Sequence, residues 1–479
     1  MTHLTTPSET ALHRRGRRLG LVLTSALLLS SCAQFSQDNG FDSVREMAGR
    51  HVAQDIRWHR TAEDFAEAQR ATKKLLDRPL TADGAVQVAL LNNRGLQATY
   101  SDLVIAEAGL VQAGRMKNPG FSLSRLSRTG EVEIERKFIF DVLGLLTIPL
   151  ATEIETRRFE HAKLRVVNQV IQVAGETRKA FYRAVAAQET LRYMQDAKLA
   201  AEAAAELGRR MAQVGNWSKL NHAREQTFYA DVLVQLARAE RRRVVERERL
   251  TRLLGLWGSD TGFQLPEQLP NLPGNPNEIE DIEAAALGQR LDLKLARAEL
   301  DALASSLGLT TATRFLGVFE LSYLRNSETG LSRQTGYEIE LSIPIFDWGQ
   351  AKVARAEHLY TQSAHRFADM AVAARSELRE AYYTYRSAYD IARHYRQEIL
   401  PVRQLISEET LLRYNGLLMS VFELLTEARL QIMDVVMGIE AQRDYWLADI
   451  DLQGAMVGVA RGPTLDLPGP VATAPTPVH

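Results

Sequence analysis

Two regions of the chain alternate apolar and polar residues with the period of a β-strand. In the segment 337–343 every odd-numbered residue is apolar and every even-numbered residue is polar, and the segment 319–323 repeats this pattern. In the first half, the segment 131–140 has apolar residues at its even positions, interrupted by Arg136. Alternation of period two is typical of a strand with one apolar and one polar face. The pattern predicts one strand pair in each half, at about residues 119–148 and 315–346.

A long helical pattern follows each predicted strand pair. From residue 166 to 194, small and apolar residues recur at alternating intervals of four and three, which is the spacing of a coiled-coil seam. The return segment repeats this spacing from Ala223 to Ala237. We expect helical hairpins at about residues 150–254 and 350–458. A helix of about 60 residues is roughly 90 Å long, so these hairpins are not the core of a globule.

The same order of elements occurs twice. The sequence "ALLNNRGLQATYSDL" from Ala89 is echoed by "ALGQRLDLKLARAEL" from Ala286, and "TIPL" at 147–150 is echoed by "SIPI" at 342–345. The first helix of each half is predicted to span about 30 residues, and in the first half Thr81 or Asp83 is its expected N-cap. The predicted divisions are an N-terminal segment at 32–80, a first repeat at 81–258, a linker at 259–280, a second repeat at 281–460 and a Pro-rich disordered tail at 461–479.

At the N-terminus, positively charged residues precede an apolar run, as in a secretory signal peptide. Four arginines between residues 14 and 18 precede an apolar run from Leu19 to Leu29, which is too short to span a bilayer. The run ends in "LSSC", which resembles the bacterial lipobox, and Cys32 is the only cysteine of the chain. The resemblance implies a signal peptide at 1–31, a lipid anchor on Cys32 and, from Ala33, an outer-membrane destination. The alternative is a signal peptide with a chance cysteine near its cleavage site.

The predicted strands are too few to close a barrel within one chain. No stretch after residue 32 has 18 uninterrupted apolar residues, so we expect no transmembrane helix. One such strand alone indicates a half-buried sheet in a soluble domain, whereas four on a lipid-anchored chain favour a water-filled membrane barrel. Unpaired strand edges are costly in hydrocarbon, so other copies of the chain must complete the barrel.

Composition narrows the possible functions. A formal net charge of −1 argues against a nucleic-acid binder or a polybasic membrane binder. The sequence has no P-loop, no H-E-x-x-H, no G-x-S-x-G and no cysteine–histidine zinc spacing, and its ten histidines are scattered. We therefore expect no enzyme, no metal site and no cofactor other than the covalent lipid.

Several motifs resemble the outer-membrane factor family, the TolC-like channels of multidrug, metal and type I secretion systems. They are the helix opening at Ala89, "RLLGLWG" at 252–258, "LSIPIFDWGQAKVARAE" at 341–357 and "RYNGLLMSVFELLTEARLQ" at 413–431. The resemblance covers essentially all of residues 33–460. It implies an α+β, mostly α fold, in which a homotrimer forms a 12-stranded β-barrel in the outer membrane that continues as an α-helical periplasmic barrel. It also assigns the strand-to-helix corners to Pro149, Pro344, Phe346 and Gly349.

The resemblance places the functional sites at the hairpin turns, which in this family form a periplasmic aperture and meet an adaptor protein. The implied contact residues are Arg210, Gly215, Trp217, Ser218, Gly416, Met419 and Ser420. For Trp217 and Met419, local packing is the alternative. The alanine–arginine pair at 428–429 assigns Glu427 and Glu423 to the aperture. Three copies of such a glutamate would form a cation-attracting ring, although both residues can also merely solvate a helix face. Arg413 and Tyr414 are expected to hold the aperture shut.

We therefore expect an outer-membrane lipoprotein that serves as the passive exit duct of a tripartite efflux or secretion system. Its partners would be two further copies of the chain, a periplasmic adaptor, outer-membrane lipid and, indirectly, an inner-membrane pump. The alternative is a periplasmic adaptor lipoprotein. Adaptors carry one hairpin flanked by small β-domains, whereas this chain has two predicted hairpins in tandem.

Overall fold

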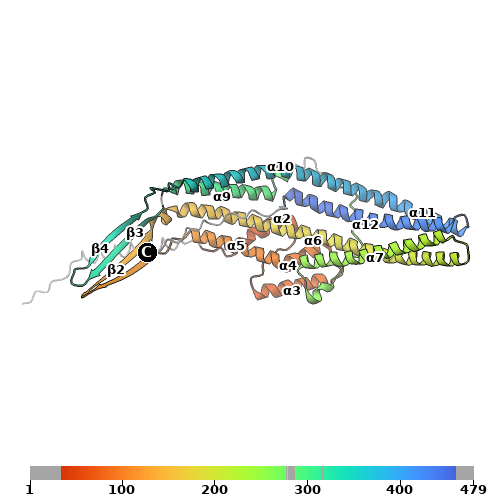
Figure 1. The fold of residues 1–479 in the computed structure, drawn as a ribbon, viewed down its shortest axis with the longest axis horizontal. Helices are drawn as coiled ribbons and strands as arrows, with labels where there is room; N and C mark the ends of the chain where they lie inside the picture. The colour runs from red at the N-terminus through yellow and green to blue at the C-terminus, as the bar shows by residue number, and fades with distance from the viewer. Residues whose placement is uncertain (1–33, 277, 279–285, 316, 460–479) are drawn as a thin grey trace, which may run out of the picture. The chain divides into compact units, whose positions relative to one another are not determined.

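The structure, a computed structural model, describes residues 34–276, 278, 286–315 and 317–459. It is mostly helical, with one small antiparallel sheet (Figure 1). The predicted lipid anchor at Cys32 and the predicted tail at 461–479 lie outside these residues. The chain forms two compact units. Unit 1 comprises Met1–Gly40, Asp102–Ala162 and Ala298–His365, and unit 2 comprises Phe41–Ser101, Lys163–Arg297 and Arg366–His479.

Helices account for most of the described chain. The α-helices are α2 (Phe41–Val52), α3 (Ala62–Leu76), α4 (Ala82–Asn92), α5 (Arg94–Ala113), α6 (Val142–Gln213), α7 (Lys219–Leu254), α9 (Leu291–Thr313), α10 (Gln350–His394), α11 (Leu400–Asn415) and α12 (Val421–Val457). A short 3₁₀ helix, η1 (Gly258–Gly262), follows α7, and a π-helical turn, η2 (Tyr395–Ile399), joins α10 to α11. Hairpin one is thus α6–α7, and hairpin two is α10–α11–α12.

The sheet belongs to unit 1 and contains both predicted strand pairs. Its strands are β1 (Gly120–Arg128), β2 (Glu131–Asp141), β3 (Phe319–Glu328) and β4 (Gln334–Leu341), paired antiparallel in the order β1-β2-β3-β4. The register places one aromatic residue from each strand in a row across the sheet: Phe121, Phe138, Tyr323 and Tyr337. All four are exposed, and within the described strands only Ser322 is buried. No described part of the chain therefore covers the apolar face of the sheet.

The first strand-to-helix corner lies earlier than predicted. Helix α6 begins at Val142, so Pro149 lies inside the helix rather than at its start, and the prediction for this residue is wrong. The carboxylate of Asp141 accepts a hydrogen bond from the backbone N–H of Gly144 (2.7 Å), which satisfies one donor of the first turn. Pro149 has no backbone N–H, so one hydrogen bond of the helix is missing at this residue, but α6 continues past it.

The second corner has the predicted glycine bend. Gly349 has a φ of +73°, and its N–H donates to Asp347 Oδ1 (2.8 Å) just before α10 begins. A Cβ at Gly349 would lie 2.7 Å from the carbonyl oxygen of Arg314, so the position requires glycine. Pro344 lies between β4 and α10, as expected. Phe346 is 97% exposed, so it does not anchor the corner within this chain.

The helix predicted from residue 81 is broken into α4 and α5 at Asn93. Thr81 is the N-cap of α4, and its hydroxyl accepts a hydrogen bond from Gly84 N–H (3.0 Å). At the break, the Asn93 side chain donates to the carbonyl of Leu253 (3.0 Å) and accepts from Leu96 N–H (3.0 Å). Asn93 therefore fixes the start of α5 against the end of hairpin one.

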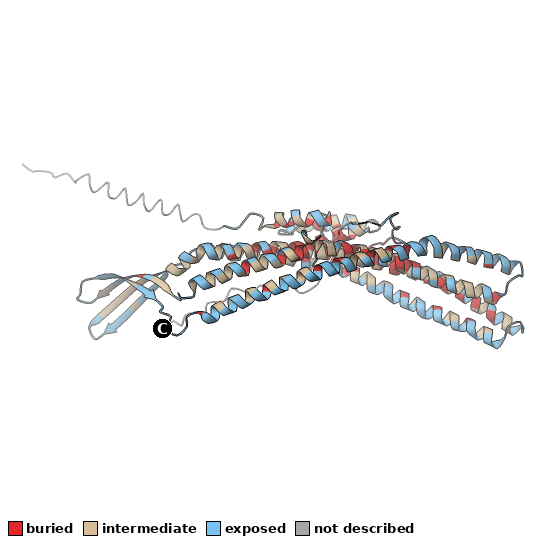
Figure 2. Ribbon diagram, turned by 90° about the horizontal axis from the view of Figure 1, so that it is seen from above, coloured by how far each residue is buried: buried red, intermediate tan, exposed pale blue. Residues whose placement is uncertain are grey.

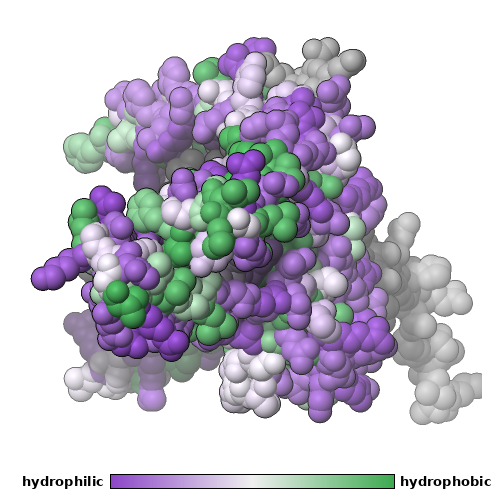
Figure 3. Space-filling model, turned by 90° about the vertical axis from the view of Figure 1, so that its right-hand side faces the viewer, coloured by the Kyte–Doolittle hydropathy of each residue, from purple (hydrophilic) through white to green (hydrophobic). Residues whose placement is uncertain are grey.

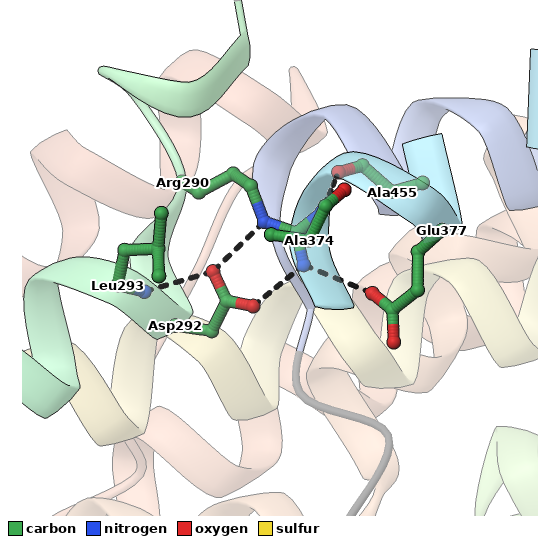
Figure 4. Close-up of polar contacts among 6 residues, drawn as sticks. All are labelled: Arg290, Asp292, Leu293, Ala374, Glu377 and Ala455. Carbon is green, nitrogen blue, oxygen red and sulfur yellow. Dashed lines mark hydrogen bonds and ion pairs between the residues drawn. The ribbon is translucent and has the colours of Figure 1, made fainter. Parts of the chain in front are cut away.

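Arg290 takes the place of Asn93 in the second repeat. Its guanidinium donates to Asp292 (2.6 Å), to Glu377 of α10 (3.1 Å) and to the carbonyl oxygens of Ala374 and Ala455 (Figure 4). The side chain is buried, and these acceptors come from the start of α9, from α10 and from the end of α12. We call this group of residues the Arg290 clasp.

Most buried residues lie on the helices of unit 2 (Figure 2). One core cluster joins α10 to α12 and includes the aromatic rings of Tyr385, Tyr389 and Tyr445. A second cluster packs α6 and α7 against Ile432 of α12. Hairpin one and hairpin two are thus in contact within unit 2.

The Arg290 clasp predicts a position that tolerates only glycine. Gly458 ends α12 with a φ of +71°, and a Cβ there would lie 2.3 Å from Asp292 Oδ1 and 2.9 Å from Arg290 Cβ. Gly458→Ala is expected to lower the free energy of unfolding by more than about 1 kcal/mol, because it adds backbone strain and displaces the clasp. Denaturant unfolding followed by circular dichroism measures this change. The control Gly454→Ala meets no atom within 4 Å and should be neutral or stabilising; equal effects of the two variants would contradict the prediction.

Candidate functional site: the hairpin tips

The turn of hairpin one is held by local contacts. Gly215 has a φ of +80°, and the Ser218 hydroxyl caps α7 by accepting a hydrogen bond from Asn221 N–H (3.2 Å). Trp217 is half-buried and packs on α6, since a Cβ at Gly208 would lie 2.7 Å from the Trp217 ring. This contact favours local packing as the role of Trp217.

The turn of hairpin two is capped in a similar way. Ser420 and Glu423 form a capping box, in which Glu423 N–H donates to Ser420 Oγ (3.3 Å) and Ser420 N–H donates to Glu423 Oε2 (2.9 Å). Gly416 follows α11 with a φ of −78°, and it is Leu417 that adopts a positive φ, of +61°. Met419 is half-buried. Glu423 is therefore a capping residue within its own chain.

Apolar side chains are exposed at both tips. Leu417 is 92% exposed and Leu418 is 81% exposed, and the others are Val214, Leu220, Leu411 and Leu412. Figure 3, which views the molecule from the side of the tips, shows apolar surface among the hydrophilic residues there. Exposed apolar groups on a tight turn are typical of an interaction surface.

Glu427 is paired within hairpin two. Arg403 of α11 donates to Glu427 (3.1 Å) and also to Asp434, both of which lie on α12. Arg413 is exposed and Tyr414 is half-buried, and neither side chain has a hydrogen-bond partner among the described residues of this chain. Both side chains are therefore available to another chain.

An ion pair that sequence reasoning missed joins the two hairpins. Arg429 of α12 donates to Glu225 of α7 (2.5 Å), and its guanidinium lies 4.4 Å from the centroid of the Phe228 ring. Glu225 is 1% exposed. The sequence does carry a signal for the burial of Glu225. This residue lies seven residues before Val232 and fourteen before Ala239, so all three share one face of α7, and that face is buried. A carboxylate on that face needs a partner.

Arg210 is bound to its own helix. Together with Arg209 it donates to Glu206 one turn earlier, with an Arg210–Glu206 distance of 2.7 Å. The two guanidinium groups lower the pKa of Glu206 from 4.5 to about 2. The last turn of α6 is thus braced by a carboxylate that stays ionised over most of the pH range.

Membrane-spanning helices and metal centres are both absent among the described residues. None of their helices has the length and apolarity needed to cross a membrane. Nor do the same residues bring together three or more histidine, cysteine, aspartate or glutamate side chains that could hold a metal ion.

Comparison with known proteins identifies the fold. Residues 284–407 match the family described as outer membrane efflux protein. No curated protein matches the sequence. Among solved structures, the chain is similar to CusC, with 17% identity and a TM-score of 0.65. The match covers 79% of this chain and 92% of that chain. The CusC structures were described in a study of folding and transmembrane channel formation.

Two further structures are outer-membrane channels. OprN has 16% identity and a TM-score of 0.66, and the match covers 85% of this chain and 98% of that chain. CmeC of Campylobacter jejuni has 18% identity and a TM-score of 0.61, with coverage of 83% and 87%. The fold is that of these channels.

The brace at Glu206 predicts a pH dependence of the first tip. Because the pKa of Glu206 is lowered, its stabilising contribution is present above pH 4.5 and is lost as the pH falls towards about 2. Backbone amides of residues 206–215 should therefore exchange hydrogen several-fold faster at pH 3 than at pH 5, after correction for intrinsic rates. Glu206→Gln should remove this pH dependence, whereas Glu202→Gln, an exposed control on the same helix, should keep it. A wild-type exchange rate that does not change with pH would contradict the prediction.

Proposed function

Because residues 284–407 match the outer membrane efflux protein family and the chain has the fold of outer-membrane channels, we propose that this protein is the outer-membrane channel of a tripartite efflux or secretion system. It is a passive duct from the periplasm to the exterior. The observation that carries the proposal is the combination, in one chain, of an open four-stranded sheet with two long helical hairpins. An adaptor role is not favoured, because the likeness to channels covers 79% or more of this chain.

The open edges of the sheet support a trimer. Among the described residues β1 pairs only with β2, and β4 pairs only with β3, so the outer edge of each carries unpaired backbone groups. In hydrocarbon each unsatisfied group costs several kcal/mol, so the edges must pair with other copies. Three copies supply twelve strands. The aromatic row with its exposed apolar neighbours then faces lipid, and the polar face, which carries the Lys137–Glu338 ion pair (2.8 Å), lines the lumen.

The exposed seam of α7 supports packing between copies along the helices. Its small and apolar residues, Ala223, Thr227, Ala230, Val234 and Ala237, are all exposed in the single chain. Residues at this spacing normally pack against another helix. In the proposed trimer, these faces join the hairpins into an α-helical barrel that extends into the periplasm.

The proposed partners follow from the tips. Their exposed leucines form a surface for a periplasmic adaptor, which connects the channel to an inner-membrane pump. Arg413 and Tyr414 face a neighbouring chain at the aperture, and Glu427 forms part of a cation-attracting ring. The proposal also includes the division of the chain into segments that end at residues 31, 80, 258, 280 and 460.

The proposal is tested by measuring the mass of the solubilised particle and its ion conductance in planar bilayers. Light scattering of the detergent-solubilised protein should give three chains per particle, and a stable monomer would contradict the trimer. In planar bilayers with a salt gradient, the wild type should conduct with a preference for cations. Glu427→Gln removes one charge per chain and should move the reversal potential towards zero. Glu240→Gln, an exposed control on α7, should leave it unchanged; absence of conductance in the wild type would overturn the proposed function.

The lipid anchor has its own test. Cys32→Ala should abolish metabolic labelling with palmitate, because the proposed thioether and the free amine of the mature terminus both depend on that cysteine. Cells expressing the wild type provide the labelled reference. Labelling that persists in the variant would place the lipid elsewhere.

A further inference from the structure

Four short segments of unit 1 lie at one edge of the sheet, where the strands end and the long helices begin (Figure 1). The register places the start of β1 beside the end of β2, and the start of β3 beside the ends of β2 and β4. Residues 114–119, 141–149, 314–318 and 342–355 therefore share this edge. They are here called the corner region, which includes the first turns of α6 and α10.

The corner region exposes a group of apolar side chains. The backbone N–H of Ser342 donates to the carbonyl of Val318 (3.2 Å), which extends the pairing of β3 and β4 beyond the strand ends. Ile343 therefore continues the apolar side of β4. The exposed apolar residues of the corner region include Leu145, Leu146, Ile343, Ile345, Phe346 and Trp348. The apolar face of the sheet thus extends into the corner region.

An aromatic pair in the corner region carries a cation. The rings of Phe315 and Trp348 meet edge to face, with their centroids 6.3 Å apart. The guanidinium of Arg314 lies 4.3 Å from the centroid of the Phe315 ring. All three side chains are exposed. Tryptophan is enriched where hydrocarbon meets lipid headgroups, and an arginine stem can lie along apolar surface while its charge stays in water.

A second cation lies close to Arg314. A Cβ built on Gly349 would lie 3.0 Å from Arg314 Cβ, so the side chain of Arg314 starts beside the beginning of α10. Lys352 comes three residues after Gly349, which places it on the same side of the first turn. Lys352 is exposed, and neither cation has an ion-pair partner among the described residues.

The carboxylates of the corner region have other partners. Its sequence contains five basic residues but only two acidic ones, Asp141 and Asp347. Asp141 pairs with Lys117 (2.8 Å), and Asp347 accepts a hydrogen bond from the N–H of Gly349 (2.8 Å). The corner region therefore combines exposed apolar surface with an excess of positive charge.

We propose that Arg314 and Lys352, together with Phe315 and Trp348, bind the headgroup of an anionic phospholipid in the periplasmic leaflet of the outer membrane. The inference rests on the proposed function, which places the apolar face of the sheet in lipid and the helices in the periplasm. The lipid phosphate accepts hydrogen bonds from the two cations, and the acyl chains lie along the apolar residues beside them. A zwitterionic headgroup carries its own positive charge, so the site favours phosphatidylglycerol over phosphatidylcholine.

The test uses the fluorescence of Trp348 in trimers reconstituted into phosphatidylcholine vesicles. The vesicles contain a minor fraction of brominated phosphatidylglycerol or of brominated phosphatidylcholine, whose bromine atoms quench a tryptophan that they contact. The Trp348→Phe variant gives the background to be subtracted. That background comes from the four tryptophans of unit 2, which are Trp58, Trp217, Trp257 and Trp446.

In the wild type, quenching should show phosphatidylglycerol enriched about fivefold at Trp348, and brominated phosphatidylcholine should show no enrichment. Arg314→Gln with Lys352→Gln should remove the enrichment. The matched control Arg128→Gln with Arg333→Gln removes the same charge at the opposite edge of the sheet and should keep it. Salt at about 1 M, which shortens the Debye length to about 3 Å, should lower the enrichment in the wild type.

Equal quenching by the two lipids in the wild type would overturn the site, as would enrichment that survives the double substitution. If the double variant does not assemble, Lys352→Gln alone should lower the enrichment at least twofold, and an unchanged value would overturn the site. A trimer that conducts ions although neither lipid quenches Trp348 would overturn the site and leave the proposed function standing. Enrichment at Trp348 in a protein that does not conduct would overturn the proposed function and leave the lipid site standing.

Discussion

The buried guanidinium of Arg290 is the interaction on which the position of hairpin two in unit 2 depends. A buried charge is tolerated only when its donors are satisfied, and here carboxylates and helix carbonyls satisfy them. Burial by itself lowers the pKa of Arg290, yet the net pKa is raised, because Asp292 and Glu377 outweigh burial. Three elements, the start of α9, α10 and the end of α12, must therefore meet at one place. In the first repeat the neutral side chain of Asn93 makes the corresponding contact.

The sheet of unit 1 is governed by a related constraint. Its backbone groups are paired in the interior of the sheet, but no described residue pairs with the outer edge of β1 or of β4. Its apolar face is exposed as well, from Phe121 on β1 to Tyr337 on β4. Water satisfies the edges but not the apolar face, and hydrocarbon satisfies the face but not the edges. Further strands at both edges, surrounded by lipid, satisfy both requirements at once.

The sequence predicted those elements whose cause is local. Period-two alternation located the strands, and the interval of three and four residues located α6, whose seam residues from Val166 to Met194 are buried. The seam predicted on α7 is exposed among the described residues. Pro149 was misplaced because Asp141 provides a start to α6 at Val142, five residues before the TIPL motif. The Glu225–Arg429 pair joins residues 204 positions apart, so the spacing along α7 indicates that Glu225 needs a partner but not that the partner is Arg429. The contacts of residues 264–274 with α10 and α12 are made mostly by backbone carbonyls, which any residue type can supply.

The two repeats share an order of elements but differ in the regularity of their helices. Both hairpins have a fixed base, at Asn93 in one repeat and at Arg290 in the other. Hairpin one then continues as unbroken helices, whereas hairpin two carries a π-helical turn, a proline and a facing glycine at one level. Duplication supplies two hairpins with the same order of elements, and a π-helical turn, a proline and a glycine are enough to make the second hairpin less regular than the first.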